Sequence, residues 1–257
     1  MFCDRRRRLI AAIFDASFPW PLFLIAFFVG GLVKGALGVG LPLVTTPLLG
    51  LGLSTYQSIS LLAAPVALSN LYQAIDGGRI VETLRRFGGL IIAQFIVTVL
   101  TVKLTLSLSA AQLNDLLALA LLLAVAMMIW QPTLSITREQ ESRMGIVVGL
   151  LAGILGGVSS LTGPVTLTYL LALKLDRETF VSTISTIYFI AALPLYGALF
   201  WYHRMTGIDL VLSIIGLLPM AAGLAIGKRV RFRLNEQLFR RLLLGFLTII
   251  ALILLFK

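Results

Sequence analysis

Six apolar runs of about 20 residues follow one another along the chain, and the short turns between them hold most of its charge. A helix needs about 20 apolar residues to cross a bilayer, so each run is long enough for one crossing. No linker is long enough to form a separate soluble domain. We therefore expect an all-α polytopic membrane protein. The runs are Thr55–Ile75, Phe87–Leu106, Leu113–Trp130, Phe180–Trp201, Ile208–Ile226 and Leu238–Phe256.

Charged residues make up only 12% of the 257 residues, whereas 59% are hydrophobic. A soluble domain usually carries about 25% charged residues, so this chain has too little polar surface to cover a water-soluble globule. The formal net charge is +10, and the basic residues lie in short clusters between apolar runs. This placement indicates topology signals and contacts with anionic lipid headgroups, and it argues against nucleic-acid binding. The clusters are Arg5–Arg8, Arg79–Arg86 and Lys228–Arg241.

Metal and redox chemistry have almost no side chains to draw on, because the chain has one cysteine, Cys3, and one histidine, His203. A disulfide within the chain is excluded, and we expect no metal and no cofactor. No Asp or Glu lies clearly in the middle of an apolar run, which weakens a carboxylate-based proton relay or sodium site. A membrane-embedded enzyme is disfavoured as well, since Ser or Lys would have to act alone.

Two further apolar runs, Pro19–Leu53 and Met144–Leu175, are too long for one ordinary crossing and are interrupted in the middle by glycine and proline. Small residues four apart let membrane helices approach closely, which explains part of the pattern. It does not explain the dense breaks that follow, because unpaired backbone groups at membrane depth are tolerated only inside protein or beside a water-filled cavity. A matched pair of interrupted segments in two halves indicates the binding site of a transporter.

The two interrupted runs resemble each other, which indicates a duplication of about 120 residues. The match extends to Gln112–Leu113, which aligns with Gln237–Leu238. The matched glycines are Gly31, Gly35 and Gly38 in the first run, and Gly149, Gly153 and Gly156 in the second. We expect a basic N-terminal segment (1–17), a first repeat (18–131), a connecting loop (132–143) and a second repeat (144–257).

The orientation of the halves follows from the distribution of Lys and Arg. If both interrupted runs cross the membrane fully, the halves are parallel and positive charge is spread almost evenly, against the positive-inside rule. If each run is a re-entrant hairpin, the halves are inverted and the basic turns share one face, with Arg5–Arg8 on the other. We favour inverted repeats, each with a Gly/Pro-broken first segment and three spanning helices, because arms of about 12–15 residues suit a hairpin better than a full span.

The glycine-rich break at Gly31–Pro47, its repeat at Gly149–Pro164 and the basic stretch after Gly227 resemble the TauE/SafE family of small membrane permeases. The resemblance covers nearly the whole chain. It implies two related halves, transport without a nucleotide-binding domain, and a small anion as substrate, often sulfur-containing, such as sulfite or an organosulfonate. We also expect an integral protein of a bacterial inner (plasma) membrane. The sequence departs from the family pattern at Lys34, where an apolar or small residue would be ordinary.

Lys34 is the most informative single residue, because a lysine at membrane depth costs about 2.5–3.5 kcal/mol on insertion scales. One interpretation is a cation that attracts an anionic substrate, helped by the positive end of a half-helix that starts near Pro42. The other interpretation is a lysine that snorkels to the membrane surface.

Hydroxyl and amide side chains near the breaks are the remaining candidates. Hydroxyls and free backbone N–H groups at the start of a half-helix can bind a sulfonate or carboxylate, or they can satisfy the broken backbone. Amides within apolar helices can line the pathway or form hydrogen bonds between helices. The predicted substrate-binding residues are Lys34, Gly38, Gly40, Pro42, Thr45, Asn70, Gln73, Gln94, Ser159, Ser160, Thr162, Gly163 and Pro164.

The sequence therefore predicts a secondary carrier or facilitator that moves a small anion by alternating access around two opposed broken helices. A transporter of a small organic carboxylate and a channel-like pore are alternatives that the sequence leaves open. The expected partners are the anionic solute and membrane lipids, without nucleic acid, and a homo-oligomer is left open.

Overall fold

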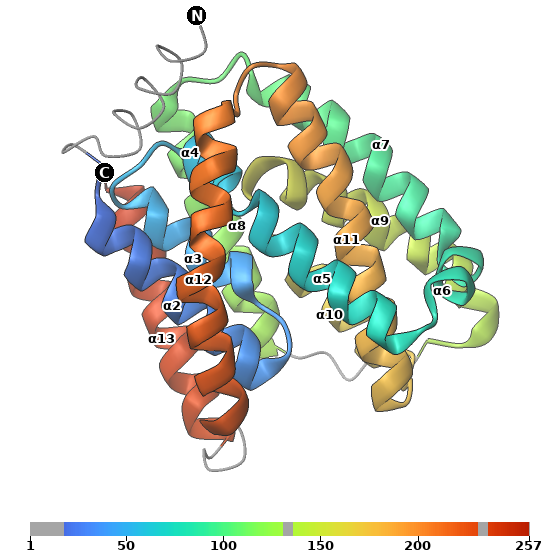
Figure 1. Ribbon diagram of the computed structural model, residues 1–257. Helices are drawn as coiled ribbons and strands as arrows, with labels where there is room; N and C mark the ends of the chain where they lie inside the picture. Colours follow the sequence, from blue (N-terminus) through green and yellow to red (C-terminus); the bar gives the residue numbers. More distant parts are fainter. Residues whose placement is uncertain (1–17, 131–135, 231–235, 257) are drawn as a thin grey trace, which may run out of the picture.

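The computed structural model describes residues 18–130, 136–230 and 236–256, and the regular structure of these residues is helical (Figure 1). The predicted basic segment 1–17, with Cys3 and Arg5–Arg8, lies outside the described residues. The first half contains α2 (Trp20–Leu37), α3 (Leu41–Gly50), α4 (Thr55–Ser60), α5 (Ala63–Gly77), α6 (Ile80–Arg86), α7 (Gly88–Thr105) and α8 (Ala110–Trp130). The second half contains α9 (Arg138–Ser159), α10 (Gly163–Ala172), α11 (Arg177–Trp201), α12 (Gly207–Val230) and α13 (Glu236–Leu255).

Seven helical segments among the described residues are long and apolar enough to cross a membrane. They lie in α2, α7, α8, α9, α11 and α12 and in the stretch Thr55–Gly77, which contains α4 and α5. Large apolar side chains are exposed on these helices, including Leu104, Trp201 and Leu218 at 72%, 78% and 75% of their surface. Such a surface needs lipid as its solvent. The prediction of an all-α polytopic membrane protein is confirmed.

Both interrupted runs break where the sequence places glycine, serine and proline. In the first run α2 ends at Leu37, and Gly38 and Gly40 have φ angles of +84° and +103°, which glycine adopts without steric cost. In the second run α9 ends at Ser159, and Ser160 takes the left-handed conformation with φ +63°. A proline stands in the first turn of the helix that follows each break, where its missing N–H leaves no intrahelical bond unmade. The predicted breaks are confirmed.

The arms of each broken run are unequal, and the expectation of two short arms is wrong. The first arms, α2 with 18 residues and α9 with 22, are both candidate spans. Only the second arms, α3 and α10 with 10 residues each, are half-helices. The helix α9 begins at Arg138, so Arg138–Arg143 are helical rather than part of the connecting loop.

The breaks also correct the register of the repeat by one helical turn. The sequence pattern pairs Gly38 with Gly156, 118 positions later, but Gly156 lies inside α9. The residue that ends α9 in the left-handed conformation, as Gly38 ends α2, is Ser160, 122 positions later. The same spacing pairs Pro42 with Pro164. Gly38 and Gly156 keep the spacing of the other glycines, but they differ in structure, because Gly38 caps α2 whereas Gly156 lies inside α9.

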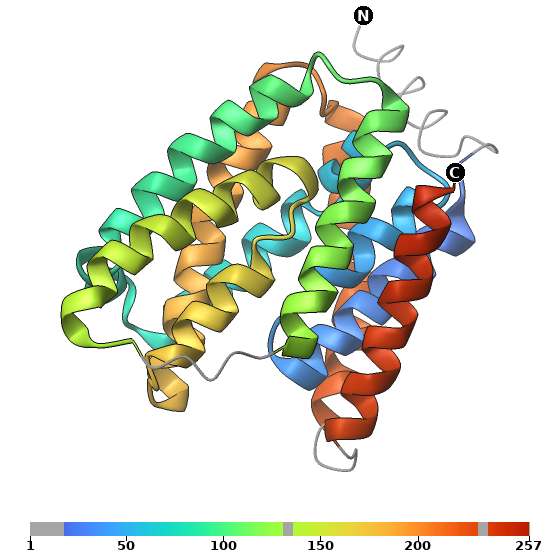
Figure 2. The same cartoon turned by 180° about the vertical axis from the view of Figure 1, so that it is seen from behind.

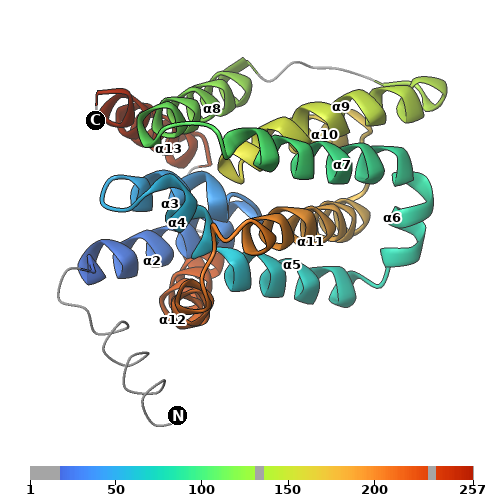
Figure 3. The ribbon, with the colours of Figure 1, turned by 90° about the horizontal axis from the view of Figure 1, so that it is seen from above.

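Helices of one predicted repeat pack against helices of the other (Figures 1 and 2). The most extensive contacts join α2 to α12 and α9 to α7, and further contacts join α5 to α11 and α8 to α13. In the view from above, α11 lies between α5 and α7 (Figure 3). Each of these four pairs takes one helix from each repeat, so the two repeats interlock.

Glycines bring the paired helices into backbone contact. A Cβ on Gly31 or Gly35 of α2 would lie 2.2 and 2.4 Å from the carbonyl oxygens of Met220 and Leu224 on α12. A Cβ on Gly149 of α9 would lie 2.3 Å from the carbonyl oxygen of Leu90 on α7. The packing interpretation of these glycines is confirmed: small residues at a membrane helix contact let the backbones approach closely.

The helix directions differ between the halves. In Figure 1, α2 runs from the upper left toward the lower end of the molecule, and α9 runs the opposite way, from the lower right upward. Both half-helices pack against the helix before them, α3 on α2 and α10 on α9. Each half-helix therefore lies beside the helix that precedes it across the break.

We expect Gly31→Ala to lower the stability of the protein by about 1–3 kcal/mol, the usual cost of overpacking, because the new methyl meets backbone rather than a movable side chain. Thermal unfolding of the purified protein in nanodiscs measures the effect. The matched control is Gly197→Ala in α11, where a Cβ meets no atom within 4 Å and helix propensity rises. Equal melting temperatures for the two variants would contradict the close-contact role of Gly31.

Candidate functional site

A cavity of about 850 Å³ lies between the two breaks. Its walls come from both broken runs and from α5, α8 and α11, so neither half encloses it alone. Eight of the predicted residues are brought together on its lining. They are Lys34, Gly40, Pro42, Asn70, Ser160, Thr162, Gly163 and Pro164.

The half-helices α3 and α10 both start at this cavity, because Gly40–Leu43 and Thr162–Pro164 line it. The first N–H groups of a helix have no acceptor within the helix, and they carry the positive end of its dipole. Two helix starts therefore direct partial positive charge into one space, which is an arrangement that favours an anion.

Lys34 adds a basic side chain at the same place. It lies in the last turn of α2 with 4% of its surface exposed, and its Nζ donates to Ser69 Oγ at 2.8 Å and Asn70 Oδ1 at 2.9 Å. Both acceptors are neutral and lie on α5. No carboxylate stands among the described residues that line the cavity. The side chain ends inside the protein on α5, which argues against a lysine that snorkels to a membrane surface.

Ser69 and Tyr188 are site residues that the predicted set lacks. Ser69 Oγ donates to the carbonyl oxygen of Pro65, which leaves its lone pairs directed to Lys34. Tyr188 lines the cavity from α11, and its hydroxyl donates to the carbonyl oxygen of Gly163 at 3.0 Å, where α10 begins. A serine next to an asparagine in an apolar helix was the available signal for Ser69.

Five predicted residues lie away from the cavity lining. Gly38 is the left-handed cap of α2. Thr45 donates to the carbonyl oxygen of Ala26, and Ser159 donates to that of Leu155, so both satisfy local backbone. Gln73 accepts from Ser185 on α11 at 3.1 Å and thereby joins two helices. Gln94 is 1% exposed on α7, and neither of its amide atoms has a partner among the described residues.

The family model described as "Sulfite exporter TauE/SafE" matches residues 22–254. The chain belongs to the TauE/SafE family. No curated protein and no solved structure matches it. The family consists of membrane transporters, and the apolar helices of this chain fit a membrane permease.

The cavity of this TauE/SafE protein reaches the surface at a mouth where Lys174, an exposed residue in the turn between α10 and α11, is part of its lining. A second pocket of about 540 Å³ is lined by Tyr56, Arg204 and Asp209, and an apolar cluster contacts the linings of both pockets, since Leu195 lines the cavity and Tyr56 packs against the cluster. The cluster consists of Ile59, Ala63, Val102, Leu195, Ala198, Leu199 and Met205.

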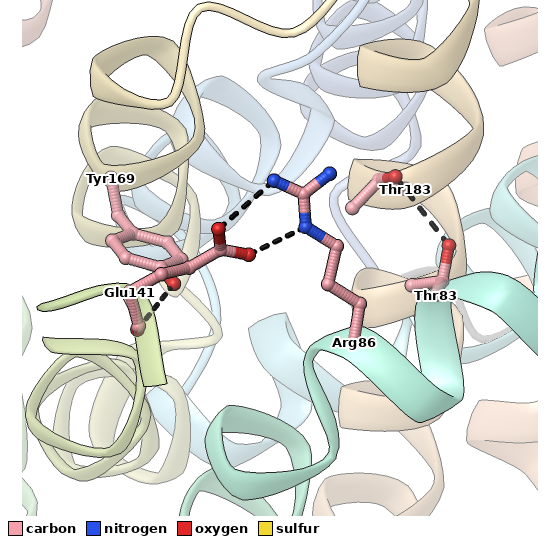
Figure 4. Close-up of polar contacts among 5 residues, drawn as sticks. All are labelled: Thr83, Arg86, Glu141, Tyr169 and Thr183. Atoms are coloured by element: carbon pink, nitrogen blue, oxygen red, sulfur yellow. Dashed lines mark hydrogen bonds and ion pairs between the residues drawn. The ribbon is translucent and has the colours of Figure 1, made fainter. Parts of the chain in front are cut away.

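An ion pair braces the second broken run (Figure 4). Arg86 in α6 donates to both oxygens of Glu141 in α9, with Nε at 2.5 Å and Nη2 at 3.0 Å. The hydroxyl of Tyr169 in α10 donates to the Glu141 carbonyl oxygen at 2.9 Å, so both arms of the second broken run, α9 and α10, meet at Glu141. The hydrogen bond to Glu141, with its negative charge, raises the pKa of Arg86 above its ordinary value.

We expect Glu141→Gln to destabilise the protein by about 1–2 kcal/mol, because a bidentate charged contact is lost while Arg86 is still 38% exposed to solvent. The matched control is Glu82→Gln, which removes the pair of Arg79 with a 57% exposed Glu82 side chain and should cost less than about 1 kcal/mol. Thermal unfolding measures both, and an equal loss in the two variants would contradict the bracing role.

Proposed function

We propose that this permease carries a small anion, with sulfite or an organosulfonate as the substrate class that the family suggests. The observation that supports this most directly is Lys34: a buried ammonium with two neutral partners, beside two half-helix starts. An unpaired charge at membrane depth is costly, so a bound anion would supply the missing counter-charge. A cation would meet three sources of positive potential in the same space.

Alternating access is the mechanism that we propose. The two halves act as inverted repeats in this proposal. Two observations support this: α2 and α9 run in opposite directions, and α2 of the first half packs on α12 of the second as α9 of the second half packs on α7 of the first. In transporters of this kind the site stays near the repeat interface while one assembly rocks against the other. The apolar cluster would open as the mouth at Lys174 closes.

The cytoplasmic side is assigned by charge. The turns that carry Arg79, Arg86, Arg138 and Lys174 gather toward the end of the molecule opposite the α11–α12 turn (Figure 1). By the positive-inside rule this end faces the cytoplasm, in our proposal that of a bacterium whose inner membrane holds the protein. The described conformation would then be open to the cytoplasm.

Two alternative functions have to be distinguished from the proposed one. A small organic carboxylate offers the same negative charge to Lys34 and the helix starts, so it competes with a sulfonate as the substrate class. A channel-like pore would need a continuous path, and the apolar cluster in contact with both pocket linings supports a carrier rather than a pore.

We expect Lys34→Met to reduce anion flux into proteoliposomes about tenfold or more, because the loss of one charged interaction of this kind weakens binding by about 1.5–3 kcal/mol. Flux of labelled sulfite and of a short organosulfonate is measured for each variant, with thermal unfolding as a check of folding. Lys34→Arg keeps the charge and should retain part of the flux. Lys103→Met, at the exposed end of α7, is the matched control and should transport normally. Wild-type flux in Lys34→Met would contradict the site.

A carrier mechanism predicts that flux saturates with substrate concentration and that unlabelled anion on the far side accelerates exchange. Both effects follow because a carrier binds substrate in one cavity, and that cavity must return to its starting orientation before it can bind substrate again. Initial rates in the same proteoliposomes, over a range of substrate concentrations, measure them. Ohmic conductance in a planar bilayer, without saturation, would favour the pore instead.

A further inference from the structure

The cavity is far larger than an inorganic oxyanion requires. Its volume is about 850 Å³, whereas a water molecule takes about 30 Å³ of liquid, so sulfite with its four heavy atoms fills only a small part. Pockets of about 300–1,000 Å³ typically enclose organic ligands of much greater size. The charged groups described above occupy one region of this space and leave most of it unexplained.

The remaining walls are mostly apolar and extend along α10, with Thr168, Tyr188 and Tyr196 as polar exceptions in addition to Lys174. The lining runs from Gly163 at the start of α10 to Ala172 at its end, and a helix of 10 residues is about 15 Å long. Leu167 and Leu171, one turn apart on α10, line the cavity together with Met127 from α8 and Phe180 from α11. Unbranched methionine adapts its shape to irregular apolar ligands.

Polar and apolar groups both line this space. Lys34 and the starts of the two half-helices supply the groups that favour an anion, and the side chains of Leu167 and Leu171 supply apolar wall. A ligand with an oxyanion at one end and a hydrocarbon body at the other would match both. Sulfite would leave the apolar walls in contact with water.

We propose that the substrate is an organic anion with an apolar tail, such as an alkyl or aryl sulfonate, bound with its head at Lys34 and its tail along α10. This inference rests on the proposed function, since the head site is the anion site described above. The tail supplies the part of the affinity that inorganic sulfite cannot obtain. Transfer of one methylene from water into an apolar site is worth about a fourfold change in affinity.

The test compares methanesulfonate, butanesulfonate and octanesulfonate as substrates and competitors of labelled sulfite flux in proteoliposomes. We expect the apparent affinity to rise about fourfold for each methylene that reaches the apolar wall. Octanol, which has the tail without the charge, should compete far less than octanesulfonate. The ratio of octanesulfonate to methanesulfonate affinity should fall in Leu167→Trp, which fills the wall, and in Met127→Trp as a second variant. Leu218→Trp on the lipid-facing surface of α12 is the matched control and should keep the wild-type ratio.

The outcomes separate this inference from the proposed function. Carriage of sulfite with equal affinity for methanesulfonate and octanesulfonate would overturn the tail site and leave the anion carrier in place. Competition by octanol as strong as that by octanesulfonate would indicate an apolar space that lipid or any hydrocarbon fills, and would also overturn it. A chain-length effect that is identical in Leu167→Trp, Met127→Trp and Leu218→Trp would reflect partition into the bilayer, against the inference. Absence of flux for every anion tested would overturn both proposals.

Discussion

Backbone contact between the repeats is the interaction on which the rest of the structure depends. Lipid tails are as apolar as leucine, so membrane helices associate mainly through close packing and hydrogen bonds. Glycines on α2 and α9 supply that packing, with no room for a Cβ against α12 and α7. Because α2 and α9 are also the helices that end at the breaks, the same contacts hold both interrupted backbones inside protein, where membrane-depth backbone can be tolerated.

The chemistry of the cavity follows from where those two helices stop. Each break starts a half-helix, and both starts line a common space with Lys34. The lysine is satisfied by a hydroxyl and an amide oxygen, with its charge unmatched among the described lining residues. Tyr188 fixes the first residue of α10, and the Arg86–Glu141–Tyr169 brace ties α10 to α9 and α6. The groups around the cavity are therefore held in position by contacts within the protein, so the proposed anion site would need little reorganisation on binding.

The sequence predicts some of these features far better than others, for physical reasons. Gly38, Gly40 and the prolines predict the breaks, because few other residues adopt the positive φ angles found there. Lys34 is conspicuous in the sequence because a charged side chain is costly to place in lipid. The left-handed residue after α9 could not be identified, since Ser160 adopts a conformation that usually signals glycine. Gln73 and Gln94 could not be separated from Asn70, because the face that a helix turns to the cavity depends on its neighbours. The unequal arms, with α2 and α9 long enough to span, were missed because apolar composition alone does not fix where a helix ends.

Each repeat supplies packing partners for the helices of the other, so the helix contacts can form only in the order in which both partners have been synthesised. The chain emerges from its N-terminus, so α7 is already made when α9 appears, and that glycine contact can form early. The glycine face of α2 waits much longer, because its partner α12 lies near the other end of the chain. The glycine face of α2 thus lacks its packing partner until the C-terminal helices are made.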